Sequence, residues 1–125
     1  MHTILVVDDE DVVRSVVRDM LEPEGYTILD TSDPQQALRI AREQPVHLLL
    51  SDVVMPLMKG PELAAKLLAA SPSTKILLMS AYPMSEVAAS GLAFLGKPFS
   101  VQRLNEKVRQ VLEPSSPFAR PARTP

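Results

Sequence analysis

Cysteine is absent from this chain of 125 residues. Its absence excludes disulfide bonds, thiolate nucleophiles and metal sites that use cysteine ligands. It is compatible with a reducing compartment, where folded proteins do not depend on disulfides. A reactive site in this chain therefore has to use oxygen and nitrogen side chains.

An excess of basic residues is also missing. The chain has 13 Lys and Arg residues against 15 Asp and Glu residues, for a formal net charge of -2. Proteins that bind nucleic acid or anionic membranes directly usually carry a basic surface, because both partners are negatively charged. We therefore expect no direct binding of this chain to nucleic acid or to a membrane.

Long uninterrupted apolar runs are lacking at the start of the chain. The apolar stretch at residues 4–7 ends in four successive acids, residues 8–11. Neither the core of a signal peptide nor a membrane span contains such a run of charge. We expect a cytoplasmic protein.

The overall composition is that of an ordinary folded domain. Apolar residues make up 46% of the chain and charged residues 22%, which argues against general disorder. The length suits one domain, which we place at residues 1–113. Residues 114–125 contain four prolines and little to bury, so a Pro-rich disordered tail is predicted there.

Strand and helix patterns alternate along the predicted domain. Apolar runs typical of strands lie at residues 3–7, 26–29, 46–50, 75–79 and, more weakly, 91–95. Apolar residues at helical spacing predict helices at 12–21, after a cap at Ser32 or Asp33, at 61–70 and, after a cap at Ser100, up to residue 112. In the first helix, Arg14 and Arg18 fall on the polar face. Residues 83–90 leave room for about two turns of a further helix.

This alternation predicts an α/β domain with a five-stranded parallel sheet and helices on both faces. Right-handed crossovers between parallel strands are well accommodated by a doubly wound sheet with the strand order 2-1-3-4-5. In that order the first and third strands are neighbours. Asp9 and Asp52, which follow or end these strands, are then expected to face each other across one cleft.

Four of the predicted strands end in residues that suit phosphate chemistry: Asp8 and Asp9, Asp52, Ser80 and Lys97. Two like charges 4 Å apart repel by roughly 4 kcal/mol at an effective dielectric constant of 20, and a bound cation removes that cost. Because the candidate ligands are all oxygens, Mg²⁺ is the expected ion, with Mn²⁺ as the alternative. The three carboxylates and Lys97 sum to -3 + 1 = -2, which a divalent cation neutralises.

The same set of groups could hold a phosphoryl group. Asp52 stands alone at the end of a central strand, and an aspartate can form an acyl phosphate. Ser80 and Lys97 offer a hydroxyl and an ammonium, which together with a metal ion stabilise a transferring phosphoryl group. Asp52 is therefore the expected acceptor.

Each of these residues also has a structural interpretation when it is taken alone. An acidic pair after a strand often caps a helix or lies in a solvated loop, and a strand-end serine or lysine is usually ordinary. His2 and His47 lie at strand starts, opposite the reactive edge, and are not expected to be catalytic. Only the combination of Asp8, Asp9 and Asp52 with Lys97 indicates a site.

Four sequence segments carry a resemblance to a known family: LVVDDE, LLLSDVVMPLMKG, ILLMSA and FLGKPF. In order and spacing they resemble the receiver domain of two-component response regulators, over roughly residues 3–112. The resemblance implies a flavodoxin-like fold and a cis peptide bond between Lys97 and Pro98. It implies the following roles: Asp52 as phosphoacceptor; Asp8, Asp9, Asp52 and the Val54 backbone carbonyl as Mg²⁺ ligands; Ser80 and Lys97 in contact with the phosphoryl group.

The family also implies a signalling role rather than an enzymatic one. Its members take a phosphoryl group from a phosphohistidine on a histidine kinase or a histidine phosphotransfer protein. Ser80 then moves toward the phosphate and an aromatic residue turns inward, so that binding to an output protein changes. Phe94 occupies that aromatic position, although as a core residue it has a simpler explanation.

One interval departs from the family pattern. Ser80 and Lys97 are 97 − 80 = 17 residues apart, about one helical turn fewer than usual in the family. This shortening resembles receivers that work alone or are attached to hybrid histidine kinases. Two alternatives stay open from the residues alone: a Mg²⁺-dependent phosphohydrolase that uses Asp52 as nucleophile, and a pseudo-receiver kept only for binding.

Overall fold

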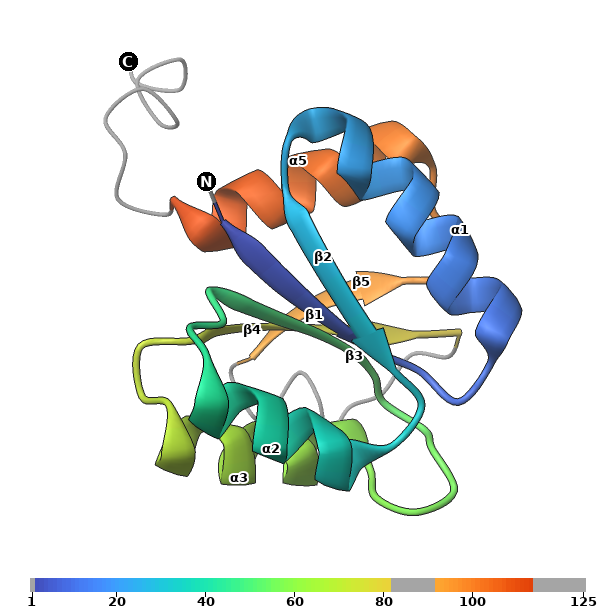
Figure 1. Cartoon of the computed structure of the whole chain (residues 1–125). Helices are drawn as coiled ribbons and strands as arrows, with labels where there is room; N and C mark the ends of the chain where they lie inside the picture. Colours follow the sequence, from blue (N-terminus) through green and yellow to red (C-terminus); the bar gives the residue numbers. More distant parts are fainter. Residues whose placement is uncertain (1, 82–91, 114–125) are drawn as a thin grey trace.

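The computed structural model describes residues 2–81 and 92–113. A parallel sheet of five strands, in the order β2-β1-β3-β4-β5, forms its centre (Figure 1). The strands are β1 (Thr3–Val7), β2 (Thr27–Thr31), β3 (Leu48–Asp52), β4 (Lys75–Ser80) and β5 (Ala93–Gly96). The predicted strand order and parallel pairing are confirmed, so the ends of β1 and β3 lie side by side at one edge of the sheet.

Helices cover both faces of the sheet. They are α1 (Asp11–Leu21), followed by the 3-10 turn η1 (Glu22–Glu24), then α2 (Pro34–Glu43), α3 (Gly60–Ala70) and α5 (Val101–Leu112). The helices α1 and α5 lie on one face, and α2 and α3 lie on the other (Figure 1). Within the described residues, no helix is long and apolar enough to span a membrane. The predicted helix at 83–90 and the predicted tail at 114–125 fall outside the described residues.

The strand residues alternate between two hydrophobic clusters. Ile4 and Val6 pack in the cluster between the sheet and helices α1 and α5. Leu5 and Val7 pack in the cluster between the sheet and helices α2 and α3. All four side chains are fully buried. A strand covered on both faces needs apolar side chains at every position, which explains the unbroken apolar run.

Several predicted strand boundaries are wrong by one or two residues, most clearly those of β2 and β3. β2 extends past Leu29 to Thr31, and β3 extends past Leu50 to Asp52, while both strands start later than predicted. Pairing with a neighbour explains the extension: Thr31 is in register with Val7, and Asp52 with Met79. Backbone hydrogen bonds between strands form regardless of side-chain polarity. A strand can therefore extend beyond its apolar run into polar residues.

Side-chain caps start two helices where the sequence predicts them. The carboxylate of Asp33 accepts a hydrogen bond from the Gln35 backbone N–H at 2.9 Å, at the start of α2. The hydroxyl of Ser100 accepts one from the Arg103 backbone N–H at 3.0 Å, at the start of α5. Each cap satisfies one of the backbone N–H groups that lack partners in the first turn of a helix.

Helix α3 begins in direct contact with the backbone at the end of β3. The Gly60 N–H donates to the Val53 carbonyl at 2.8 Å. A Cβ atom at position 60 would lie 2.5 Å from the Asp52 carbonyl oxygen, which is closer than real contacts allow, and 3.0 Å from the Val53 Cα. A glycine at this position is what allows α3 to start so close to Asp52.

Replacing Gly60 by alanine should therefore destabilise the fold. We expect the free energy of unfolding to fall by about 1–3 kcal/mol, the usual cost of forcing an extra carbon into a packed site. Gly96→Ala is the matched control, because a Cβ at position 96 meets nothing within 4 Å. Urea denaturation of both variants measures the difference, and an equal effect of the two substitutions would contradict this explanation.

Candidate functional site

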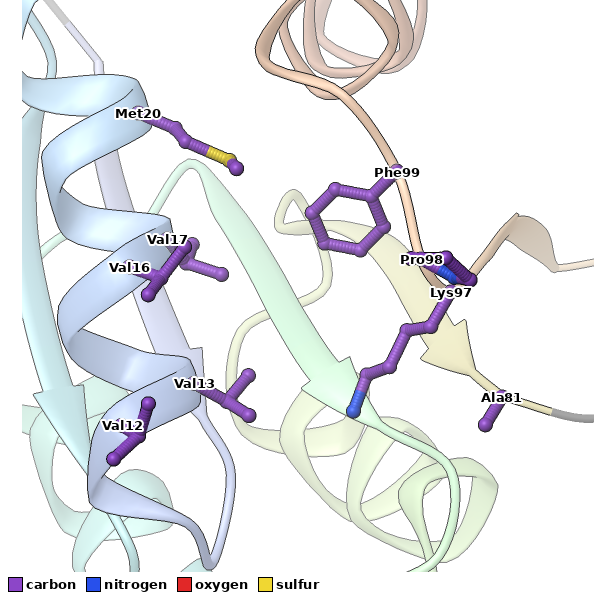
Figure 2. A pocket seen from close by; sticks show the side chains of 9 residues that line it. All are labelled: Val12, Val13, Val16, Val17, Met20, Ala81, Lys97, Pro98 and Phe99. Carbon is purple, nitrogen blue, oxygen red and sulfur yellow. The ribbon is translucent and has the colours of Figure 1, made fainter.

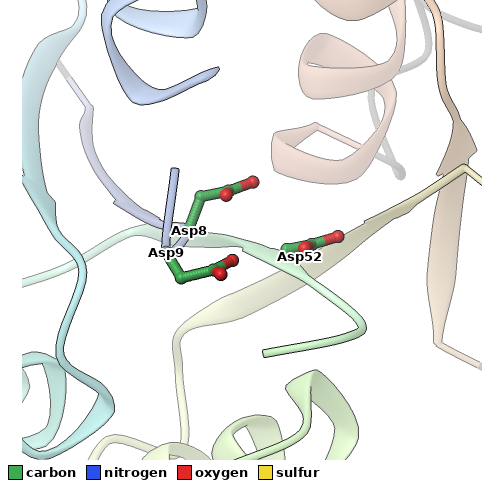
Figure 3. Close-up of side chains that lie close together, drawn as sticks. All are labelled: Asp8, Asp9 and Asp52. Atoms are coloured by element: carbon green, nitrogen blue, oxygen red, sulfur yellow. The ribbon is translucent and has the colours of Figure 1, made fainter. Parts of the chain in front are cut away.

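Three carboxylates meet at the carboxyl ends of β1 and β3. Asp8 and Asp9 directly follow β1, and Asp52 is the last residue of β3. Figure 3 shows the carboxylates of Asp8 and Asp9 on the side that faces Asp52. One carboxylate oxygen from each residue lies within 4.8 Å of the others. Asp8 is buried, Asp52 is partly buried and Asp9 is exposed, so the cluster opens to solvent on one side.

Lys97 bridges two of these carboxylates. Its Nζ lies 3.4 Å from Asp8 Oδ2 and 3.3 Å from Asp52 Oδ1. Lys97 follows β5, and its backbone N–H donates to the Ser80 carbonyl at 2.7 Å, which ties it to the end of β4. The peptide bond between Lys97 and Pro98 is cis. Residues from β1, β3 and the end of β5 are thus brought to one place.

The electrostatics of the site are those of crowded, partly buried charges. Burial raises the pKa of Asp52 above its usual value; Lys97 opposes this effect and Asp8 adds to it. Burial alone would lower the pKa of Lys97, but the carboxylates of Asp8 and Asp52 outweigh burial and raise it. Lys97 therefore stays charged at neutral pH, and its ammonium contacts two of the three carboxylates.

Ser80 occupies the end of β4, as predicted. It is 2% exposed and pairs with Gly96 of β5, one residue beyond the Met79 that pairs with Asp52. Because β4 lies next to β3, Ser80 is at the same edge of the sheet as Asp52.

The residue after Asp52 is held firmly by its backbone. The Val53 N–H donates to the Met79 carbonyl and the Val53 carbonyl accepts from the Gly60 N–H, both at 2.8 Å. Val54 comes next, and this residue is 53% exposed. Phe94 is half-buried in β5 and packs against the cluster between the sheet and helices α2 and α3.

The oxygens of the cluster suit a small divalent cation. Two oxygens bound to one Mg²⁺ at about 2.1 Å are at most about 4.2 Å apart. The carboxylate oxygens lie within 4.8 Å of each other, so shifts of about 0.6 Å would bring them to that distance. With Lys97 included the cluster carries a charge of -2, which such an ion neutralises. The three carboxylates therefore fit Mg²⁺.

An apolar groove of about 470 Å³ borders this cluster (Figure 2). Figure 2 shows the stem of Lys97 at one end of it, between α1 and the segment that leads into α5. Its walls are formed by Val12, Val13, Val16, Val17, Met20, Ala81, Lys97, Pro98 and Phe99. Val12 is 74% exposed and Val16 44% exposed, so an apolar surface adjoins the acidic site.

The two histidines lie apart from these residues. His2 and His47 directly precede β1 and β3, at the opposite edge of the sheet, with their ring centroids 5.2 Å apart. The Nδ1 atom of His47 accepts a hydrogen bond from the Thr3 N–H at 2.8 Å. This bond gives His47 a structural role.

Arg14 is the residue of the site that sequence reasoning missed. The helical pattern places it on the polar face of α1, yet its side chain is only 15% exposed. Its Nη1 donates to the backbone carbonyl of Asp8 at 2.8 Å. Hydrophobic periodicity cannot reveal such a contact, because the contact runs from a helix back to the loop before it.

Comparisons with known proteins agree with this geometry. Residues 4–109 match the model of the response regulator receiver domain. The chain is 36% identical over 118 residues to the sensor kinase CckA of Brucella abortus, covering 89% of this chain and 12% of that protein. It is 33% identical over 115 residues to the probable transcriptional regulatory protein TcrX of Mycobacterium tuberculosis, covering 88% of this chain and 49% of that protein. The chain thus spans less than half of either relative.

Solved structures show the same fold. The receiver domain of a hybrid histidine kinase CckA superposes with a TM-score of 0.77 at 38% identity, covering 88% of this chain and 98% of that one. The response regulator TrrA from Thermotoga maritima, solved in complex with Mg²⁺ and BeF, gives a TM-score of 0.81 at 31% identity, covering 90% of this chain and 100% of that one. With the family match over residues 4–109, this chain belongs to the response regulator receiver domain family.

Proposed function

We propose that this chain is a phospho-accepting signalling switch of a two-component system or phosphorelay, with Asp52 as the phosphoacceptor. The observation that carries the proposal is the contact of Lys97 Nζ with both Asp8 and Asp52, at 3.4 and 3.3 Å. That contact supports the proposal because it joins a positive charge to the cluster of carboxylates that includes the partly buried Asp52. The membership in the receiver family supports the same function.

The chemistry is a transfer of one phosphoryl group. An oxygen of Asp52 attacks the phosphorus of a phosphohistidine, a P–O bond forms and the P–N bond breaks. The leaving imidazole takes up a proton and the carboxylate becomes an acyl phosphate. In this proposal the Lys97 ammonium and the Ser80 hydroxyl bind oxygens of the transferring group.

The metal ligands in this proposal are Asp8, Asp9, Asp52 and the backbone carbonyl of Val54. The separation of the three carboxylates supports the first three. The two backbone hydrogen bonds of Val53 support the Val54 carbonyl as the fourth ligand, because they fix the path of the chain directly after Asp52. Bound Mg²⁺ would neutralise the carboxylates and draw charge from the phosphoryl oxygens.

The phosphodonor in this proposal is a histidine kinase or a histidine phosphotransfer protein in the cytoplasm. A protein donor that reaches Asp52 has to cover the surface around it. The apolar groove beside Lys97 is part of that surface, and exposed apolar patches of this kind mark sites of association. Phosphorylation would then change binding to an output protein, with Ser80 and Phe94 as the proposed switch residues.

The two alternatives receive less support. A phosphohydrolase would need a second acid to protonate its leaving group, often two residues after the nucleophile. In this chain that position is Val54, which is exposed and cannot donate a proton. A pseudo-receiver kept only for binding would not need the double contact of Lys97 with Asp8 and Asp52.

The proposal predicts that acetyl phosphate and Mg²⁺ add one phosphoryl group to the chain. Asp52→Asn should abolish the labelling, since an amide cannot form the acyl phosphate. Intact-mass spectrometry detects the added group. Asp19→Asn, which changes an exposed acid on α1, is the control and should label like the wild type. Equal labelling of the Asp52 variant would refute the assignment.

Charge crowding predicts a second effect of Asp52→Asn. Without Mg²⁺, the substitution should raise the free energy of unfolding at neutral pH by on the order of 1 kcal/mol, because it removes one of three repelling charges. Burial raises the pKa of Asp52 in the folded state, so the cost of its charge is present at neutral pH. This cost shrinks as the pH falls below the folded pKa and is gone below the pKa of Asp52 in the unfolded chain. The gain should therefore shrink in acid.

Mg²⁺ should make the wild type more stable than Asp52→Asn. At a concentration one hundred times its dissociation constant, a ligand that binds only the folded state adds about 2.7 kcal/mol to the free energy of unfolding. The wild type should gain most of this amount and Asp52→Asn clearly less. Urea denaturation with and without Mg²⁺ measures all four values. A variant that is less stable than the wild type without Mg²⁺ would contradict the charge-crowding explanation.

A further inference from the structure

Arg14 links three parts of the chain around the acidic site. Its Nη1 donates to the Asp8 carbonyl at 2.8 Å, in the loop between β1 and α1. Its Nη2 pairs with Asp11 in the first turn of α1. Its Nε lies 3.6 Å from Asp30 Oδ1, on the edge strand β2. The guanidinium is rigid and planar, so its hydrogen bonds to the Asp8 carbonyl and to Asp11 fix the relative position of these groups, while Asp30 adds an ion pair.

The Asp8 carbonyl belongs to the peptide bond that joins the two acids of the pair. In an extended strand, successive side chains point to opposite faces, yet Asp8 and Asp9 both present an oxygen within 4.8 Å of Asp52. The backbone therefore has to turn at this peptide. Arg14 binds the carbonyl oxygen at that turn.

The other polar atoms of Asp8 are also held. Its N–H donates to the Thr31 carbonyl at 3.3 Å, its Oδ1 accepts from the Glu10 N–H at 2.9 Å, and its Oδ2 lies 3.4 Å from Lys97 Nζ. The Arg14 contact is the part of this arrangement that comes from a helix side chain. Groups that orient metal ligands in this way typically change metal affinity 10–100-fold when they are removed.

We propose that Arg14 is a positioning residue, which holds the Asp8–Asp9 peptide so that both carboxylates face Asp52 and can bind one Mg²⁺. This inference rests on the proposed function, because it assumes that the three carboxylates bind the metal. Arg14 itself touches neither the ion nor the phosphoryl group. It acts through the backbone of the two acids.

The sign of the effect separates positioning from simple electrostatics. Arg14 is a cation close to a cation site, so Coulomb repulsion alone predicts that its removal tightens Mg²⁺ binding. Positioning predicts the opposite, because the Asp8–Asp9 peptide would lose its fixed orientation. One substitution therefore tests both interpretations.

Arg18 offers a matched control on the next turn of the same helix. It pairs with the same Asp30, through Nη2 at 2.9 Å, and with Glu22 at 2.8 Å. Its guanidinium nitrogens donate to the side chains of Asp30 and Glu22, whereas Arg14 reaches the backbone of the loop between β1 and α1. Arg18→Gln thus removes an equal charge and an ion pair with Asp30 while leaving the Asp8 carbonyl bound.

The experiment titrates Mg²⁺ into metal-free wild type, Arg14→Gln, Arg14→Lys and Arg18→Gln, with calorimetry for affinity and thermal unfolding for stability. Arg14→Gln should bind Mg²⁺ about tenfold more weakly. Arg18→Gln should bind at least as tightly as the wild type. Arg14→Lys keeps the charge but not the planar fork, and should fall between the wild type and Arg14→Gln. In amide NMR spectra without metal, Asp9 and Glu10 should shift in Arg14→Gln and not in Arg18→Gln.

The outcomes distinguish this inference from the proposed function. If the wild type binds Mg²⁺ and Arg14→Gln binds it equally well or more tightly, the positioning role is wrong and the metal site stands. If both arginine variants weaken binding equally, the effect is a general loss of stability and the positioning role is also wrong. If the wild type itself binds no Mg²⁺, the proposed function fails and the inference fails with it.

Discussion

The repulsion among Asp8, Asp9 and Asp52 is the constraint on which the rest of this structure depends. One oxygen from each lies within 4.8 Å of the others, and a pair of such charges at 4 Å costs roughly 4 kcal/mol at an effective dielectric constant of 20. The contacts of Lys97 with Asp8 and Asp52 offset part of that cost. The remaining negative charge suits the site to a divalent cation.

A scaffold that holds like charges together has to be rigid at the strand ends. Each acid follows or ends a central strand with both faces covered, and residues 4–7 are fully buried. On the β3 side, backbone bonds of Val53 to Met79 and Gly60 fix the chain directly after Asp52. On the β1 side, the Asp8 backbone is held by Thr31 and Arg14. Hydrophobic packing thus supplies the free energy that keeps the carboxylates close.

Much of this arrangement could be predicted from the sequence, because strand order and apolar runs determine which residues share an edge. The sheet order and the meeting of Asp8, Asp9, Asp52 and Lys97 follow from that reasoning and are confirmed. The polar ends of β2 and β3 were missed, because pairing with neighbours extends a strand beyond its apolar run. The contact of Arg14 with the Asp8 carbonyl was also missed. It depends on how α1 packs against the loop that precedes it, which hydrophobic periodicity does not report.

The central claim is that strand ends assemble a Mg²⁺-dependent acceptor at Asp52. A crystal structure of the chain with Mg²⁺ and beryllium fluoride, which mimics a phosphoryl group, tests it most directly. The account predicts beryllium bonded to an Asp52 oxygen, Mg²⁺ bound to Asp8, Asp9 and Asp52, and Lys97 in contact with a fluoride. Crystals grown under the same conditions with Asp52 unmodified, or with the metal bound away from these three carboxylates, would contradict it.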